Sequence, residues 1–328
     1  MTLGGLAWHA ENEVQFLEES RSYYAAPWQF LAGRDLVTLS GGNVVKLLKQ
    51  SGGTNLFLTI LDGDGNIVAA PLQYGPVDSA ATMGPKQQIA ALADGGFMVV
   101  WYESNNTSVE NRLYFQSFDA DGTARETPLA MFQNPAGIGN QLVDYSITAL
   151  DDGRTAVLAN FNASDYQRAF VVEGDGSAAS LVGTTDDPQM RFHVIAAVAK
   201  SDGFTRLTID EEVVGPSQRQ DLIVVTDFIE NSSTGALEQQ ASRILLTLPA
   251  GSANEVLDVV YTRLGSDDLA AFWKSGSDNK LYLLTEIGGI ASSTAVSLPF
   301  DSTGNASISS VSASEAGDGG ARVTAGPR

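Results

Sequence analysis

A turn-and-strand motif recurs along this chain, and it constrains the fold more than any other feature of the sequence. The clearest copy is Leu92-Ala-Asp-Gly-Gly-Phe-Met-Val-Val-Trp101, an Asp-Gly turn followed by an apolar strand. Weaker copies with the same order of turn and strand begin at Leu39, Leu150, Lys200, Leu264 and Ala316. The copies follow one another at a mean interval of about 55 residues, which indicates a fold built from repeated structural units.

A second signature follows the motif within each full unit. In the clearest unit, apolar and polar residues alternate over 111–118, and the turn Asp119-Ala-Asp-Gly122 comes next. Alternation that ends in an Asp-Gly turn is typical of a strand entering a hairpin. We therefore expect this unit to contain four strands, at 87–92, 96–104, 111–118 and 126–132.

Four short antiparallel strands per repeat are typical of a β-propeller blade, whose faces are buried by the neighbouring blades. The sequence therefore predicts an all-β chain that forms one β-propeller domain over residues 1–328. We expect six four-stranded blades, with repeats that begin near residues 34, 87, 144, 193, 256 and 306. The last copy has room for only two strands, so segments 12–19 and 24–30 are expected to complete the last blade. The alternative is an open β-solenoid or a pair of β-sandwiches.

The motif at 92–101 followed by the segment 114–122 resembles propeller-like repeats of large secreted bacterial proteins of the RTX (hemolysin-type calcium-binding) group. The resemblance is clear over residues 87–125. It implies an extracellular adhesive or spacer role. The Gly-Gly-x-Gly-x-Asp nonapeptides that bind calcium in that group do not occur in this chain, so calcium-driven folding is not implied.

The composition limits which binding partners and which cellular locations are expected for this protein. Acidic residues outnumber basic residues 39 to 19, and the net charge of −20 repels nucleic acid and anionic membrane surfaces. No apolar run is long enough for a transmembrane helix, and residues 1–14 lack the pattern of a signal peptide. Because there is no cysteine, disulfides and thiolate sites are excluded. We expect a secreted protein, a cell-surface protein or a component of an extracellular particle, with no membrane insertion.

Two Asp-rich turns have the spacing of calcium-binding loops, in which alternate side chains converge on one cation. The twelfth position of each loop, where a bidentate Glu is expected, is Gln73 or Ala130 instead. Asp-Gly is also a favoured hairpin turn, so a purely structural role is the alternative for both loops. The candidate calcium ligands are Asp62, Asp64, Asn66, Asp119 and Asp121. No other cofactor is indicated.

Signatures of catalysis are weak. Adjacent acids at 151–152, 186–187 and 210–212 are candidates for the paired carboxylates of glycoside hydrolysis, but adjacent residues on a strand point to opposite faces. The segment 266–273 resembles a sialidase-type box without its glycine, and the repeat alone explains it. His9 and His193 are too few for a multi-histidine metal centre.

We therefore expect a non-enzymatic binding or assembly module that presents its loops to a protein or glycan partner. Function on a repeat fold is carried by the divergent loops, here 103–110, 212–219 and 230–237. One alternative is a carbohydrate-active hydrolase or lyase with acids in the central channel. The other is a subunit of a surface layer, an appendage or a phage tail, which would form homo-oligomers. Trp101 and Trp273 occupy equivalent repeat positions and are expected to pack between blades.

Overall fold

The computed structural model describes residues 28–29, 36–50, 55–77, 82–105, 110–133, 142–161, 166–186, 191–215, 218–248, 256–263, 268–275, 281–287, 290–296, 308–315 and 321–327. All regular elements within these ranges are β-strands. No helix that could cross a membrane occurs among them.

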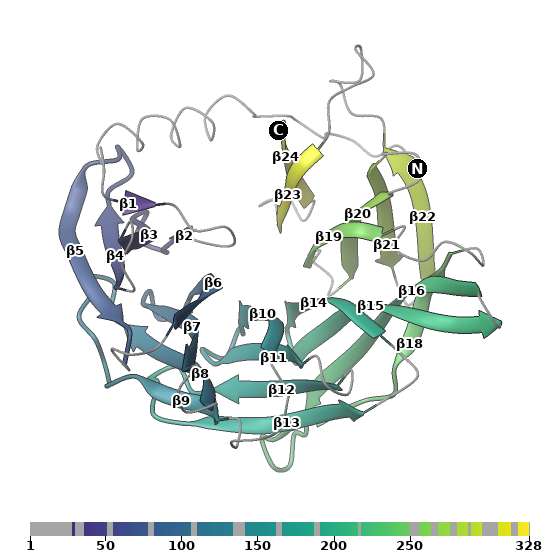
Figure 1. Ribbon diagram of the computed structural model, residues 1–328, viewed down its shortest axis with the longest axis horizontal. Helices are drawn as coiled ribbons and strands as arrows, with labels where there is room; N and C mark the ends of the chain where they lie inside the picture. The colour runs from purple at the N-terminus through teal and green to yellow at the C-terminus, as the bar shows by residue number, and fades with distance from the viewer. Residues whose placement is uncertain are drawn as a thin grey trace. The chain divides into compact units, whose positions relative to one another are not determined.

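The described strands form six antiparallel sheets, numbered here in chain order (Figure 1). Sheet 1 contains β1 (Trp28–Gln29), β2 (Leu36–Thr38), β3 (Val44–Gln50), β4 (Leu56–Leu61) and β5 (Ile67–Gly75). Sheet 2 contains β6 (Thr82–Ala91), β7 (Phe97–Asn105), β8 (Glu110–Phe118) and β9 (Leu129–Gln133). Sheet 3 contains β10 (Leu142–Ala149), β11 (Thr155–Phe161), β12 (Tyr166–Val172) and β13 (Ala179–Asp186).

The other three sheets come from the C-terminal part of the chain. Sheet 4 contains β14 (Arg191–Lys200), β15 (Gly203–Gly215), β16 (Gln218–Glu230), β17 (Leu237–Gln239) and β18 (Arg243–Thr247). Sheet 5 contains β19 (Val256–Arg263), β20 (Leu269–Ser275), β21 (Leu281–Ile287) and β22 (Ile290–Val296). Sheet 6 contains β23 (Ile308–Glu315) and β24 (Ala321–Pro327).

The repeated turns have one shared geometry. In the turn between β6 and β7, the N–H of Leu92 donates to the carbonyl oxygen of Gly96 at 2.8 Å, and the N–H of Gly95 donates to that of Leu92 at 3.0 Å. Gly95 has a φ of +93°, in the left-handed region that glycine occupies without strain. This is a tight hairpin turn that ends in a left-handed residue. The Asp-Gly pairs of the sequence therefore mark real strand ends.

The chain divides into two compact units, and each is described by itself. The first unit, residues 11–185, holds sheets 1 to 3, and the second unit holds sheets 4 to 6. In the first unit, one apolar core fills the space between sheets 1 and 2 and another fills the space between sheets 2 and 3. In the second unit, a third core lies between sheets 4 and 5. Stacked four-stranded sheets that share their cores in this way are the blades of a β-propeller.

Edge strands of neighbouring sheets also adjoin. β2, β6 and β10 lie next to one another in the first unit, as do β14, β19 and β23 in the second. The β-propeller prediction is thus confirmed, and β6 to β9 match the four strands expected for the clearest repeat. Trp101 is fully buried between sheets 1 and 2, as predicted. The side chain of Trp273 lies outside the described residues.

The predicted closure of the last blade is corrected in one respect. Trp28 and Gln29, within the segment 24–30, pair with Gln50 and Lys49 of β3. The physical reason is that the short strand β2 covers only Val44 to Lys46, so the remaining edge of β3 is available to β1. Residues 28–29 therefore add to sheet 1. The other predicted closing segment, 12–19, lies outside the described residues.

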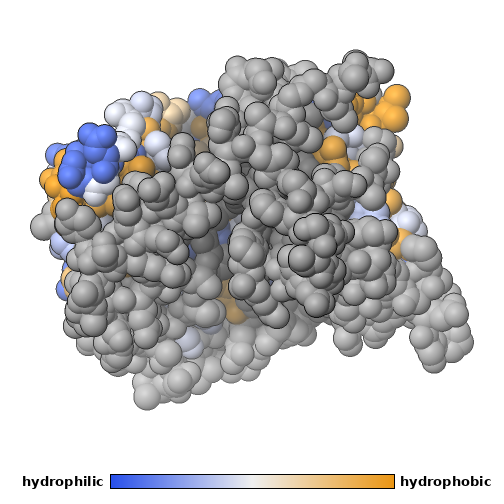
Figure 2. Space-filling model, turned by 90° about the horizontal axis from the view of Figure 1, so that it is seen from above, coloured by the Kyte–Doolittle hydropathy of each residue, from blue (hydrophilic) through white to orange (hydrophobic). Residues whose placement is uncertain are grey.

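The described surface exposes separate apolar side chains. Figure 2 shows apolar residues beside hydrophilic ones in the coloured part of that face. Val68 on β5, Leu181 on β13 and Ile290 on β22 are 55%, 52% and 76% exposed. These three residues belong to the outermost strands of three different sheets. Ile287 on β21, which pairs with Ile290, is also exposed, at 55%.

Candidate functional site

The turn at 62–66, the first predicted calcium loop, is closed by its own hydrogen bonds. The backbone N–H groups of Asp64 and Asn66 donate to Asp62 Oδ1 at 3.0 and 2.8 Å. Asn66 Nδ2 donates to Asp62 Oδ2 at 3.0 Å. The side-chain hydrogen bond from Asn66, followed by the backbone ones, holds the pKa of Asp62 below its ordinary value. The Asp62 carboxylate thus stabilises the turn directly.

In the second predicted calcium loop, at 119–123, an aspartate also accepts a hydrogen bond from the backbone of its own turn. The N–H of Thr123 donates to Asp121 Oδ1 at 2.8 Å and lowers the pKa of Asp121. Arg125 Nε donates to Asp119 Oδ1 at 2.8 Å. Among the described residues, no group of three or more acidic or histidine side chains is arranged to hold a metal ion. Calcium at these turns stays a prediction.

The acidic pairs singled out in the sequence lie in different environments. Asp151 and Asp152 occupy an exposed turn, where Arg154 Nε donates to Asp152 Oδ2 at 2.7 Å. The residues 186 and 210–212 lie on strands, but their side chains are outside the described part, as is residue 187. The side chain of His193, residue His9 and the turn at 266–267 are also outside it.

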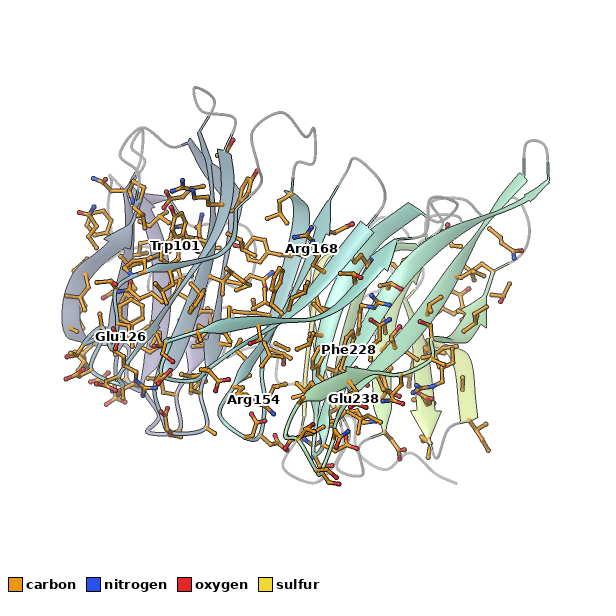
Figure 3. All side chains as sticks on the ribbon, turned by 90° about the horizontal axis from the view of Figure 1, so that it is seen from below. Trp101, Glu126, Arg154, Arg168, Phe228 and Glu238 are labelled. Carbon is orange, nitrogen blue, oxygen red and sulfur yellow. The ribbon has the colours of Figure 1, made fainter. Side chains whose placement is uncertain are left out.

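Arg125 joins the hairpin turns of sheets 2 and 3. Its Nη1 lies 2.7 Å from Asp94 Oδ2 and donates to the carbonyl oxygen of Gly174 at 3.1 Å. Ser117 Oγ also donates to the carbonyl oxygen of Asp175 at 2.7 Å. The hydrogen bond from Arg125 is the main reason why the pKa of Asp94 is lowered. Figure 3 shows Glu126 and Arg154 near this turn end of the first unit, and Trp101 away from it.

Sheets 4 and 5 are joined by a second arginine. Arg243 at the start of β18 donates to the carboxylate of Asp227 on β16 through Nη1. It also donates to both carboxylate oxygens of Glu286 on β21, through Nε at 2.7 Å and Nη2 at 2.8 Å. Thr205 Oγ1 donates to Asp227 Oδ1 at 2.5 Å, and Lys200 Nζ lies 3.7 Å from the same oxygen. The two carboxylates are therefore already neutralised by cations.

The charge of Asp227 makes a pH-dependent contribution to stability. Burial raises the pKa of Asp227, but hydrogen bonds from Thr205 and Arg243 and the charge of Lys200 outweigh it, so the pKa is lowered. A lowered pKa means that the stabilisation is present at neutral pH and is lost as the pH falls below about 4. We expect Asp227→Asn to lower the free energy of unfolding by about 2 kcal/mol at pH 7 and by a smaller amount at pH 3, because the carboxylate loses its charge as the pH falls through the lowered pKa. Urea unfolding of both proteins across this range measures the difference.

Asp152→Asn is the matched control for this prediction. Asp152 pairs with Arg154 within one exposed turn, so its loss is expected to cost about 0.5 kcal/mol or less at any pH. A cost for Asp227→Asn that stays constant from pH 7 to pH 3 would show that the carboxylate charge does not matter to the junction.

Two further carboxylates are buried in their sheets. Glu103 on β7 is 3% exposed, and its Oε1 accepts from Trp101 Nε1 and from the backbone N–H of Val77, each at 2.7 Å. Asp221 on β16, in the second unit, is 1% exposed. Each lies near the end of its strand opposite to the Asp-Gly turns, toward the loops 106–109 and 216–217 respectively. Their position makes Glu103 and Asp221 the candidate functional acids of the described residues.

Sequence reasoning named the loop that begins at Glu103 but missed Asp221, Asp227 and Glu286 as buried acids. A usable signal exists for Asp227, which interrupts the apolar run Leu222 to Phe228. A carboxylate inside a buried strand requires a partner. The identity of that partner is not in the local sequence, because Arg243 lies 16 residues further along the chain.

Comparisons with known proteins support the fold. No family model and no curated protein matches the chain. The alpha-L-arabinanase of Penicillium chrysogenum, solved with arabinobiose, is similar over 80% of each chain, with 10% identity and a TM-score of 0.53. The alpha-L-arabinofuranosidase of Fusarium graminearum, also with arabinobiose, covers 85% of this chain and 82% of its own, with 10% identity and a TM-score of 0.49. The Nup133 β-propeller domain of Vanderwaltozyma polyspora covers 91% and 97%, with 8% identity and a TM-score of 0.39.

These comparisons contradict the expectation of a non-enzymatic binding or assembly module. The structure with the highest of the three TM-scores is that of an alpha-L-arabinanase, which is an enzyme. The fold alone is shared at 10% identity, so no catalytic residue is carried over from that enzyme.

Proposed function

We propose that this chain is a carbohydrate-active hydrolase or lyase. The observation that carries the proposal is the similarity to the Penicillium arabinanase over four-fifths of both chains, at a TM-score of 0.53. Propellers of this kind use the loops at one end of the blades to contact ligands, because loops can diverge while the sheets are retained. An extracellular location, which we also propose, would give such an enzyme access to polysaccharide.

The buried acids support the chemistry. Glycoside hydrolysis requires a carboxylic acid to protonate the leaving oxygen and a second carboxylate to act as base or nucleophile. Asp94, Asp119, Asp227 and Glu286 are held by arginines at the turn ends or at a sheet junction, where they hold sheets together. Glu103 and Asp221 lie toward the opposite strand ends. We assign each of these residues, within its own unit, as a candidate for the catalytic acid.

The test is an activity assay on linear and branched arabinan, galactan and oligogalacturonate, with detection of reducing ends and of unsaturated products. We expect the chain to release sugar from at least one of these polymers. Glu103→Gln should lower kcat by about 100-fold or more, because removal of an acid or base costs on the order of 10² to 10⁴ in rate. Circular dichroism and the melting temperature are measured in parallel to show that the variant is folded.

Asp152→Asn is again the control, because Asp152 is an exposed turn residue and its loss should leave kcat unchanged. If Asp152→Asn loses as much activity as Glu103→Gln, the loss reflects a general destabilisation of the protein and not the removal of a catalytic acid. The absence of activity on every polymer, by a folded protein with and without added calcium, would overturn the proposal. Equal kcat values for Glu103→Gln and the parent chain would overturn the assignment of Glu103.

A further inference from the structure

One buried glutamine of sheet 3 makes no side-chain hydrogen bond to the rest of the protein. Gln167 is the second residue of β12 and is 1% exposed. Neither Oε1 nor Nε2 of its side chain has a hydrogen-bond partner among the protein groups. In the described part of the chain, it is the only buried amide side chain that lacks a partner at both polar atoms. Because proteins bond nearly all of their buried polar groups, this amide requires a physical explanation.

Other buried glutamines of the first unit have the usual partners. Gln88 is bonded through both polar atoms to backbone groups of β10. Gln116 on β8 is 7% exposed, and its Nε2 donates to the carbonyl oxygen of Glu126 at 2.8 Å. The sheets of this unit therefore supply partners to buried amides where the fold requires them. Gln167 is an exception to this pattern.

The surroundings of Gln167 do not supply the missing partners. An exchange of its oxygen and nitrogen positions creates no hydrogen bond, since both atoms lack a partner. The residues two positions further along β11 and β12 on the same face are Leu158 and Ala169, which are 1% and 2% exposed. Their side chains are apolar. A polar amide in this position lowers stability unless a bound molecule completes its hydrogen bonds.

Gln167 belongs to a row of polar residues at one end of sheet 3. Its register partner on β11 is Asn160, which is 3% exposed, and the register partner of Asn160 on β10 is Asp144. The row lies at the strand ends toward the loop 162–165, opposite to the Asp-Gly turn at 152–153. Glu103 lies at the corresponding end of sheet 2. Divergent loops at this end are where a ligand of a repeat fold is expected.

The chemistry of an amide limits what can bind to Gln167. Its carbonyl oxygen only accepts hydrogen bonds, and its amino group only donates them. A metal cation would contact Oε1 and leave Nε2 without an acceptor, whereas an anion would bond to Nε2 and leave Oε1 without a donor. A hydroxyl group both donates and accepts, as water does, so a molecule of this class can satisfy both atoms.

We propose that Gln167 is the polar contact of a binding site on sheet 3 for a neutral hydroxylic molecule, either ordered water or a hydroxyl group of a sugar. The sugar form of this site rests on the proposed carbohydrate-active function. The water form is independent of that function. Neither form involves Glu103, so the site is tested by binding and not by turnover.

NMR of the full chain with isotopically labelled glutamine tests the site. The side-chain amide signal of Gln167 is assigned by its loss in Gln167→Met, which keeps the length of the side chain but has no amide. Cross-relaxation between this signal and a long-lived water, unchanged by added sugar, supports the water form and overturns the sugar form. A chemical-shift change on titration with arabinobiose, galactobiose or digalacturonate supports the sugar form, provided that the Gln116 signal stays unchanged. A signal with neither response overturns the site.

Variants then test the sugar form by its affinity. A disaccharide that shifts the Gln167 signal should bind to Gln167→Met about 10-fold more weakly, because hydrogen bonds worth about 1 kcal/mol each are lost and each 1.4 kcal/mol is a factor of ten. Gln116→Met is the matched control and should bind as the parent chain does, because Gln116 is also buried but has a protein partner. Equal affinity of Gln167→Met and the parent chain overturns the sugar form.

Gln167→Asn provides a second variant in case Gln167→Met fails to fold. It keeps the amide but shortens the side chain by one methylene, and it also removes the labelled glutamine signal, so the assignment is retained. Its affinity should lie between those of the parent chain and Gln167→Met, and an affinity equal to that of the parent chain overturns the sugar form. A chain that binds a disaccharide at Gln167 but cleaves no polymer would refute the proposed enzyme and leave this site in place.

Discussion

Trp101→Ala is expected to lower the free energy of unfolding of the first unit by about 4 kcal/mol, the largest effect of any single substitution considered for this chain. The indole is fully buried between sheets 1 and 2. It stacks on Tyr114 at a ring distance of 5.7 Å and meets the edge of Tyr74 at 5.3 Å. Its removal leaves a cavity and also takes one hydrogen-bond donor from the buried carboxylate of Glu103. Urea unfolding followed by tyrosine fluorescence and circular dichroism measures the loss.

Two variants separate the parts of this effect. Trp101→Phe keeps an aromatic ring but removes the indole N–H, so it should cost about half as much as the alanine variant. Leu181→Ala removes an exposed side chain and should cost about 0.5 kcal/mol or less. If Trp101→Ala costs less than about 1 kcal/mol, the aromatic cluster does not hold sheets 1 and 2 together.

The strand pattern could be predicted because it depends on local chemistry. Gly95, Gly122 and Gly153 each have a φ close to +90°, and each directly follows an aspartate in the sequence. An Asp-Gly turn needs only these neighbours to form, so it is visible in the sequence without knowledge of the fold. The alternation of apolar residues between such turns then gives the strands.

The candidate site could not be predicted in the same way. The hydrogen-bond partners of a candidate acid come from different repeats. For example, the N–H of Val77 donates to Glu103, which lies 26 residues further along the chain. Repeats that are similar in sequence also differ in the residues that join them to the next sheet. Arg125 joins sheets 2 and 3 through backbone and turn acids, whereas Arg243 joins sheets 4 and 5 through two buried carboxylates. The error over segment 24–30 has a similar origin, since the free edge of β3 depends on the short length of β2.

Gln88→Met is expected to lower the free energy of unfolding by about 3 kcal/mol, because the glutamine makes hydrogen bonds to two buried backbone groups at the edge of the adjoining sheet. Gln88 lies on β6 and is buried. Its Nε2 donates to the carbonyl oxygen of Tyr145 at 2.7 Å, and its Oε1 accepts from the N–H of Ile147 at 2.9 Å. Both partners belong to β10, the edge strand of sheet 3. The Gln88 side chain thus makes the two hydrogen bonds to β10 that the backbone of a neighbouring strand would otherwise make.

The methionine variant keeps the length and volume of the side chain, so it isolates the two hydrogen bonds from packing. In the variant, the carbonyl of Tyr145 and the N–H of Ile147 would each lose the hydrogen bond with Gln88, and the penalty for each loss is about 1 to 3 kcal/mol. Hydrogen exchange of the Ile147 amide should therefore accelerate more than that of Ser146, whose backbone faces β11 in the pairing of this strand. Gln88→Glu gives a second test, since a carboxylate can still accept from Ile147 but repels the carbonyl of Tyr145. A Gln88→Met protein as stable as the parent chain would show that the hydrogen bonds of Gln88 do not hold sheets 2 and 3 together.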